Sequence, residues 1–157
     1  MLKDYAMEFA KYKKLGSRTL AQIPDDTLNM ITAADGNSIA MIIRHLHGNL
    51  VSRFTDFLTT DGEKDTRDRK TEFATVVYSR SEVENFWGAA WVHLETALSQ
   101  LSDVDLTKTI TIRGEPMTVD AALCRALAHV AYHTGQIVLL GRTAKAGAWE
   151  SLSNPRR

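Results

Sequence analysis

The sequence predicts an all-α protein, and three observations carry that prediction. Four long segments repeat their apolar residues at helical spacing. All three prolines fall between these segments rather than inside them. Only one short stretch, 108–119, alternates in the manner of β-strands. We therefore expect a four-helix bundle of the up-down-down-up type, with one long crossover and a small hairpin or extended loop before the last helix.

The first two helices are expected in the N-terminal third of the chain. The first should run from about residue 3 to Pro24, with a weak point at Gly16-Ser17, and a connector should follow over 25–35. Asn37-Ser38 offers an N-cap for the second helix. The residues that define its apolar face are Ile39, Ile42, Ile43, Leu46, Leu50 and Phe57.

The second half of the chain supplies the other two helices. The stretch 59–73 is rich in charge and is expected to form a solvent-facing loop. Ser81 and Glu84 have the spacing of a capping box at the start of the third helix. The fourth should extend from about Thr118 to Gly141, followed by an irregular tail.

Composition narrows the function classes. The chain has 157 residues, which fits a single domain over 1–157, and its 19 basic and 19 acidic residues cancel. A nucleic-acid-binding protein normally has a basic surplus, so we expect no nucleic-acid partner. The apolar runs 39–43 and 136–140 are too short to cross a membrane, and the N-terminus does not resemble a signal peptide. A lone cysteine, Cys124, which we expect to be a small core residue, fits a cytoplasmic protein.

The histidines are the candidate functional residues. His129 and His133 are four residues apart, so they lie on one helix face, about 6 Å apart at Cβ, and could bind one cation. A third ligand must come from another helix. His45 and His47 point about 200° apart, so only one of them can join a compact site. The helical wheel slightly favours His47, without settling the choice, and His93 is expected to be a surface or packing residue.

At these residues the chain resembles the DinB/YfiT-like superfamily. The second-helix string NSIAMIIRHLHGNLVSRF and the later HVAYHTGQIVLLGR carry the likeness, and the His-x-x-x-His-x-Gly-Gln run is its most specific part. Within the superfamily the chain is similar to an uncharacterised branch, over roughly Asn37 to Pro155. The branch motifs are Gly48-Asn49 with Ser52-Arg53, Asp61-Gly62-Glu63-Lys64, and Trp149-Glu150-Ser151-Leu152-Ser153.

The resemblance implies a four-helix bundle that holds a metal ion with three histidines. The first ligand in this family lies in a His-Leu or His-Val step, which here is His45-Leu46, and the other two match His129 and His133. This implication overrides the helical-wheel preference for His47, an extra histidine relative to the branch. In the 59–73 loop, the chain also lacks the Trp that the branch tends to show before its first Arg. This difference affects only a surface segment.

Three neutral imidazoles leave a coordination position open on a divalent ion. That position can activate water or a thiol, which predicts hydrolysis or thiol transfer. Imidazole suits zinc, nickel, iron or copper, and we expect zinc or nickel, with iron as a further candidate. Superfamily members with assigned roles are similar to thiol S-transferases and thiol-dependent isomerases, which use low-molecular-weight bacterial thiols. Val130 stands where zinc peptidases have a Glu, which argues against a peptidase.

Three functional hypotheses follow from these patterns. The first is a metal-dependent enzyme acting on a small molecule, and the second is a non-catalytic, stress-related metal-binding bundle. The third is a helical interaction protein with structural histidines. Asn49 and Gln136 could orient the histidine rings, although capping or interhelical bonding is the simpler role. The arginines that could meet an anionic substrate, but are more simply solvated, are Arg44, Arg53, Arg125 and Arg142. From the resemblance and from apolar residues at the bundle edges we expect a homodimer.

Overall fold

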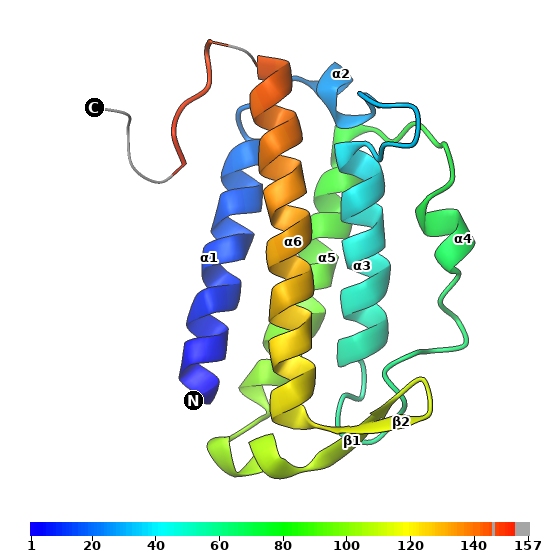
Figure 1. Ribbon diagram of the computed structural model, residues 1–157, viewed down its shortest axis with the longest axis vertical. Coiled ribbons are helices and arrows are strands. Elements are labelled where there is room, and N and C mark those ends of the chain that lie inside the picture. Colours follow the sequence, from blue (N-terminus) through cyan, green and yellow to red (C-terminus); the bar gives the residue numbers. More distant parts are fainter. Residues whose placement is uncertain (146, 153–157) are drawn as a thin grey trace.

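The computed structural model describes residues 1–145 and 147–152, and the protein is mostly helical. Its four long helices are α1 (Leu2–Leu20), α3 (Ile39–Phe54), α5 (Arg80–Ser99) and α6 (Val119–Lys145). They lie side by side, with α1 and α6 running upward in Figure 1 and α3 and α5 running downward. The most extensive contacts join α3 to α5 and α1 to α6, and α3 also packs against α6.

Short elements connect the long helices. They are α2 (Asp25–Leu28), α4 (Arg69–Glu72), the 3-10 helix η1 (Asp103–Thr107), β1 (Thr109–Ile112) and β2 (Glu115–Thr118). The two strands pair antiparallel, with Ile110 opposite Met117, so the small hairpin before the last helix is confirmed. Its turn places Arg113 and Gly114 at φ 57° and 75°. Positive φ at both central residues suits the twist of a two-residue hairpin.

Local signals explain where the helices begin, with one correction. Ser38 caps α3 by accepting a hydrogen bond from the Met41 amide, as the sequence predicted. The capping box of α5 is formed by Ser79 and Glu82, not by Ser81 and Glu84. Because both pairs have the same spacing, sequence alone could not separate them. At the C-terminal end, α1 stops at Leu20, ahead of Pro24, while α6 continues beyond Gly141.

The apolar faces of the long helices meet in one continuous core. Its largest fully buried side chains include Trp91, Phe9, Ile43, Leu94 and Leu123. Within the described ranges, no helix is long and apolar enough to cross a membrane.

Cys124 is exposed, so its prediction as a core residue is wrong. It follows Leu123, which is fully buried, and successive positions on a helix point about 100° apart, which turns the thiol outward.

The tail returns to the end of α1. The Arg18 guanidinium donates to the backbone oxygens of Ser151 and Leu152, and Gln22 exchanges two hydrogen bonds with the Glu150 backbone. The last motif residue, Ser153, and Pro155 lie outside the described residues.

Candidate metal centre

Three histidines from two helices converge between α3 and α6. His45 belongs to α3, and His129 and His133 are one turn apart on α6. One ring nitrogen of each lies within 4.8 Å of the other two, and the Nε2 atoms of His45 and His129 are 3.1 Å apart. His45 is 5% exposed and His133 is 9% exposed. The structure thus brings together the three residues that the family resemblance implied.

His47 and His93 lie apart from this cluster. His47 packs against Phe86 of α5 and contacts Arg44, while His93 Nδ1 is 3.3 Å from the Thr55 hydroxyl. The helical-wheel preference for His47 is therefore wrong for this cluster. Because α3 packs more extensively on α5 than on α6, its mean apolar direction points toward α5. A side chain on the flank, such as His45, is the one that faces α6.

A buried carboxylate holds the His45 ring. Glu72, at the end of α4, lies with Oε2 2.8 Å from His45 Nδ1 and is 1% exposed. Arg67 donates to both carboxylate oxygens, at 2.8 and 3.0 Å. Burial alone would raise the pKa of Glu72, but the hydrogen bonds from His45 and Arg67 and the Arg67 charge lower it to about 2. The carboxylate is therefore an ionised acceptor that orients the imidazole.

Hydrogen bonds at Nδ1 orient two of the rings, which leaves the lone pair of Nε2 as the donor that each can offer to a metal ion. His45 donates Nδ1–H to Glu72, and His133 Nδ1 lies 2.8 Å from Gln136 Oε1. The Gln136 amide is itself oriented by its second bond, from Nε2 to the Tyr132 hydroxyl. Of the two roles considered for Gln136, this contact with the His133 ring fits the orienting role rather than the simpler one of capping or interhelical bonding. For His45 this tautomer directs the Nε2 lone pair toward His129, whose Nε2 is 3.1 Å away.

His129 is the ring whose surroundings most oppose a proton. Burial, and then the nearby His133 and His45 rings, lower its pKa to about 3. Burial also lowers the pKa of His133, although the bond to Gln136 opposes the shift. In addition, His129 Nδ1 is buried without a hydrogen-bond partner in the described residues. Both rings are neutral at physiological pH, the form in which imidazole binds metals.

The spacing fits a shared divalent ion. Metal–nitrogen bonds of about 2.0–2.1 Å in tetrahedral geometry place two ligand nitrogens about 3.3 Å apart. The 3.1 Å separation between the His45 and His129 nitrogens is close to this value, whereas the three ring nitrogens together spread over up to 4.8 Å, so an ion would draw the rings closer. Without an ion, two neutral rings at this distance need a proton between their nitrogens. The donor set, three imidazoles and no thiolate, suits a borderline transition metal.

Two sequence motifs of the branch contact each other beside the cluster. Ser52 donates to the Gly62 carbonyl at 3.0 Å and accepts from the Lys64 amide at 2.9 Å. Arg53 also donates to the Gly62 carbonyl and pairs with Glu63 at 3.0 Å. The start of the 59–73 loop is thus fastened to the end of α3.

The 59–73 loop was predicted to face the solvent, and this prediction is wrong for Arg67 and Glu72. The side chains of Arg67 and Glu72 are only 3% and 1% exposed. Charged residues are buried when they are paired, and Glu72 pairs with Arg67 in the same loop and with His45, 27 residues away on α3. Sequence reasoning missed Glu72 because neither periodicity nor spacing relates it to His45. The only unusual feature of the 59–73 segment in the sequence was its high density of charged residues between two apolar helices.

A cavity of about 210 Å³ opens onto His45 and His129. Its polar wall includes Asn49 and several arginines, and its apolar floor is formed by α3, β1 and α6. The full lining is His45, Asn49, Arg53, Phe54, Phe57, Arg69, Ile112, Arg113, Ala122, Arg125, Ala126 and His129. A small molecule in this space would reach the nitrogen cluster directly.

Comparison with known proteins agrees with this description. The sequence model of DUF1572, a family of proteins of unknown function, matches residues 1–157. The crystal structure of a DinB-like protein from Bacillus cereus ATCC 10987 is similar, with a TM-score of 0.67 and 19% identity over 91% of this chain and 92% of that chain. No curated protein matches the chain. The chain therefore belongs to the DUF1572 family and has a DinB-like fold.

Proposed function

We propose that this protein is a metal-dependent enzyme whose three histidines, His45, His129 and His133, hold one divalent ion. Zinc or nickel is the favoured ion, with iron as a further candidate. When bound, such an ion lowers the pKa of water or a thiol in its open position and so supplies a nucleophile at neutral pH. The reaction is then a thiol transfer or a hydrolysis on a small molecule.

The observation that carries the proposal is the convergence of oriented ring nitrogens beside a cavity. Glu72 and Gln136 fix two of the rings, and this support serves a ligand role better than a packing role.

The cavity lining favours a nucleophile that is activated by the ion rather than by a side chain. It contains no carboxylate among the residues that the structure describes. Glu72 is close, but both its oxygens are committed to His45 and Arg67. A thiol suits this environment because it needs no general base once it is bound as thiolate.

Further properties are proposed with this function. We infer a single-domain, DinB-type four-helix bundle with up-down-down-up order, as the helix directions in Figure 1 suggest. The lone cysteine supports a cytoplasmic location. A homodimer is proposed from the family resemblance.

Elemental analysis of protein purified without a histidine tag tests the site. We expect about one ion per chain, and no ion in the His45→Ala, His129→Ala and His133→Ala variants. His47→Ala is the matched control, since its ring packs against Phe86 outside the cluster, and it should keep the ion. Retention of the ion in all four variants, or its absence from the wild type after metal supplementation, would contradict the metal site.

Turnover separates the enzyme from a non-catalytic metal-binding protein. The loaded protein is offered a low-molecular-weight thiol with an alkyl halide or epoxide, and separately a panel of esters and amides. Product formation that disappears in His129→Ala supports the enzyme. Metal binding without turnover across both panels supports the stress-related, non-catalytic alternative.

A further inference from the structure

We infer that the cavity beside the three histidines is a subsite for an oxyanion group, a carboxylate or phosphate, on the substrate. This inference rests on the proposed function for the substrate's role, but its anion-binding step needs no metal. Four guanidinium groups line the cavity, those of Arg53, Arg69, Arg113 and Arg125, and no Asp or Glu of the described chain does. In a protein with no net charge, this is a strong local excess of positive charge.

Two of the four arginines have a structural partner. Arg53 and Arg113 share the Glu63 carboxylate, at 3.0 and 2.9 Å, and these pairs tie α3, the loop and the hairpin together. Because one carboxylate serves both, these arginines form a positive wall that is only partly neutralised. Their role in the cavity is to shape it and to add to its potential.

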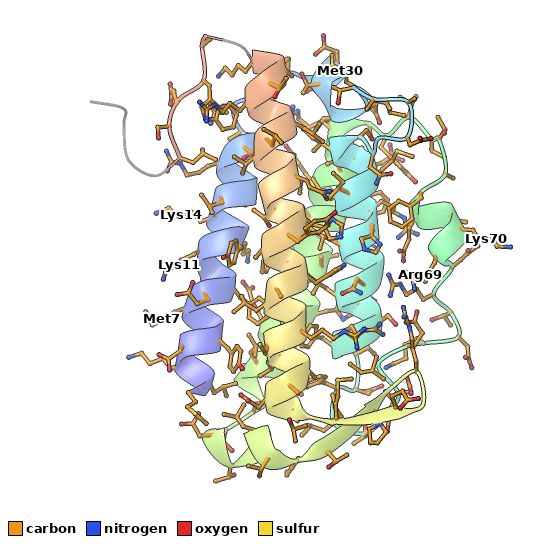
Figure 2. The ribbon with its side chains drawn as sticks, in the orientation of Figure 1. Met7, Lys11, Lys14, Met30, Arg69 and Lys70 are labelled. Atoms are coloured by element: carbon orange, nitrogen blue, oxygen red, sulfur yellow. The ribbon has the colours of Figure 1, made fainter. Side chains whose placement is uncertain are left out.

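The other two arginines have no ion-pair or hydrogen-bond partner in the described residues. Arg69 lies on α4 and Arg125 on α6, and both are exposed toward solvent at the mouth of the cavity. Figure 2 shows the Arg69 side chain directed back toward α3, whereas the neighbouring Lys70 points away from the molecule. An arginine pair with free donors beside a cavity is suited to bidentate binding of a carboxylate or phosphate.

The spacing along the helices connects these donors to the histidine cluster. Arg125 precedes His129 by four residues and Asn49 follows His45 by four, so each is one turn from a histidine on the same helix face. The Asn49 amide has no hydrogen-bond partner in the structure as described, although it lines the cavity. An anion held by Arg125 and Arg69 would therefore place the rest of a short molecule against the histidines.

Size and apolar lining restrict the ligand further. The cavity, about 210 Å³, is smaller than the 300–1,000 Å³ typical of drug-sized sites, so the ligand is small. Phe57, Ile112 and Ala126 provide an apolar floor between the arginines and the rings. The substrate class is a short molecule with an oxyanion at one end and the reacting group at the other.

Calorimetric titration of the metal-stripped protein tests the subsite. The probes are succinate and inorganic phosphate, with neutral succinamide for comparison. We expect one of the anions to bind, succinamide not to bind, and Arg69→Gln and Arg125→Gln each to weaken binding by about tenfold. The anion that binds more tightly identifies carboxylate or phosphate as the recognised group.

Arg142→Gln is the matched control. Arg142 lies on the same helix as Arg125, roughly 25 Å further along its axis, outside this cavity. The control should bind the anion as the wild type does. Equal weakening in all three variants, or binding of neither anion to the wild type at millimolar concentration, overturns the inference.

Metal content, measured on the same samples, keeps this result separate from the proposed function. Anion binding that depends on Arg69 and Arg125 in a protein that never takes up metal would reject the metal site and leave the subsite intact. Full metal loading with no anion binding would reject the subsite alone.

Discussion

Replacing Gly48 by alanine should break the support of the His45 ring while leaving every histidine in place. Gly48 lies on α3 where Glu72 approaches the helix. A Cβ at this position would lie 2.8 Å from Glu72 Cδ and closer still to Oε1, inside the distance that real Cβ atoms keep. The carboxylate must therefore move, and its hydrogen bonds to His45 and Arg67 are lost or lengthened.

Two opposing effects determine how much the Gly48→Ala change alters the free energy of unfolding. Alanine stabilises a helix interior by about 1 kcal/mol relative to glycine. Breaking a buried, hydrogen-bonded ion pair destabilises by about 3–5 kcal/mol. The Gly48→Ala variant should thus lose about 2–4 kcal/mol of unfolding free energy, which for a chain of this size lowers Tm by roughly 5–15 °C. Metal affinity should fall by about 10- to 100-fold because the ring loses its orienting partner.

The assay compares urea unfolding and metal competition in this variant with those in Gly88→Ala. Gly88 is an interior residue of α5, and an added Cβ there meets nothing within 4 Å, so alanine should stabilise the protein by up to about 1 kcal/mol. If Gly48→Ala is as stable as this control and binds the metal as tightly, the close approach of Glu72 does not support the site, and the reasoning fails.

Three further changes test other contacts. Glu72→Gln keeps the shape but removes the charge, so metal affinity should fall by about 10- to 100-fold in a chelator competition, and an unchanged affinity would contradict the orienting role. In the metal-free protein, the pKa of His129 is about 3 in the folded state, below its ordinary value of 6.5. Between about pH 3 and pH 6.5 the unfolded chain therefore binds one more proton at this residue than the folded chain does. Stability should therefore be complete above about pH 6.5 and decline as the pH falls, and equal urea midpoints at about pH 7.5 and about pH 5 would refute this. Gly16→Ala should destabilise by about 1–3 kcal/mol in thermal unfolding, because its Cβ would overlap the Trp87 ring; a stabilised variant would show that the ring can move.

Periodicity was sufficient to predict the four long helices, because the apolar residues of an amphipathic helix repeat at helical spacing along its buried face. The same logic predicted that His129 and His133 share a face. It failed at His45, since the wheel averages over a helix that packs on two neighbours and points to the larger contact. The resemblance to a known family supplied that residue instead. The first helix shows a related limit: Gly16 looked like a weak point, but in the structure it admits the Trp87 ring.

The 59–73 loop was the hardest part to predict, and its chemistry explains why. A charged segment is normally solvated, and its burial becomes favourable only where each charge has a partner. Here Arg67 and Glu72 neutralise each other and present one carboxylate oxygen to His45. Such pairings leave no periodic trace in the sequence.

The 59–73 loop contacts both the three-histidine cluster and the arginine-lined cavity. Glu72 ends α4, which also carries Arg69, so the short helix that orients a metal-site histidine also presents one arginine to the cavity. Arg67 contacts both Glu72 and Glu63, and Glu63 in turn holds Arg53 and Arg113. A shift of the loop would therefore disturb the ring, the arginine wall and the cavity together. Because these contacts are coupled, a Glu63→Gln change should weaken metal binding, since the loop that carries Glu72 loses an anchor. The same change removes the negative charge that Arg53 and Arg113 share, so anion binding in the cavity should become tighter.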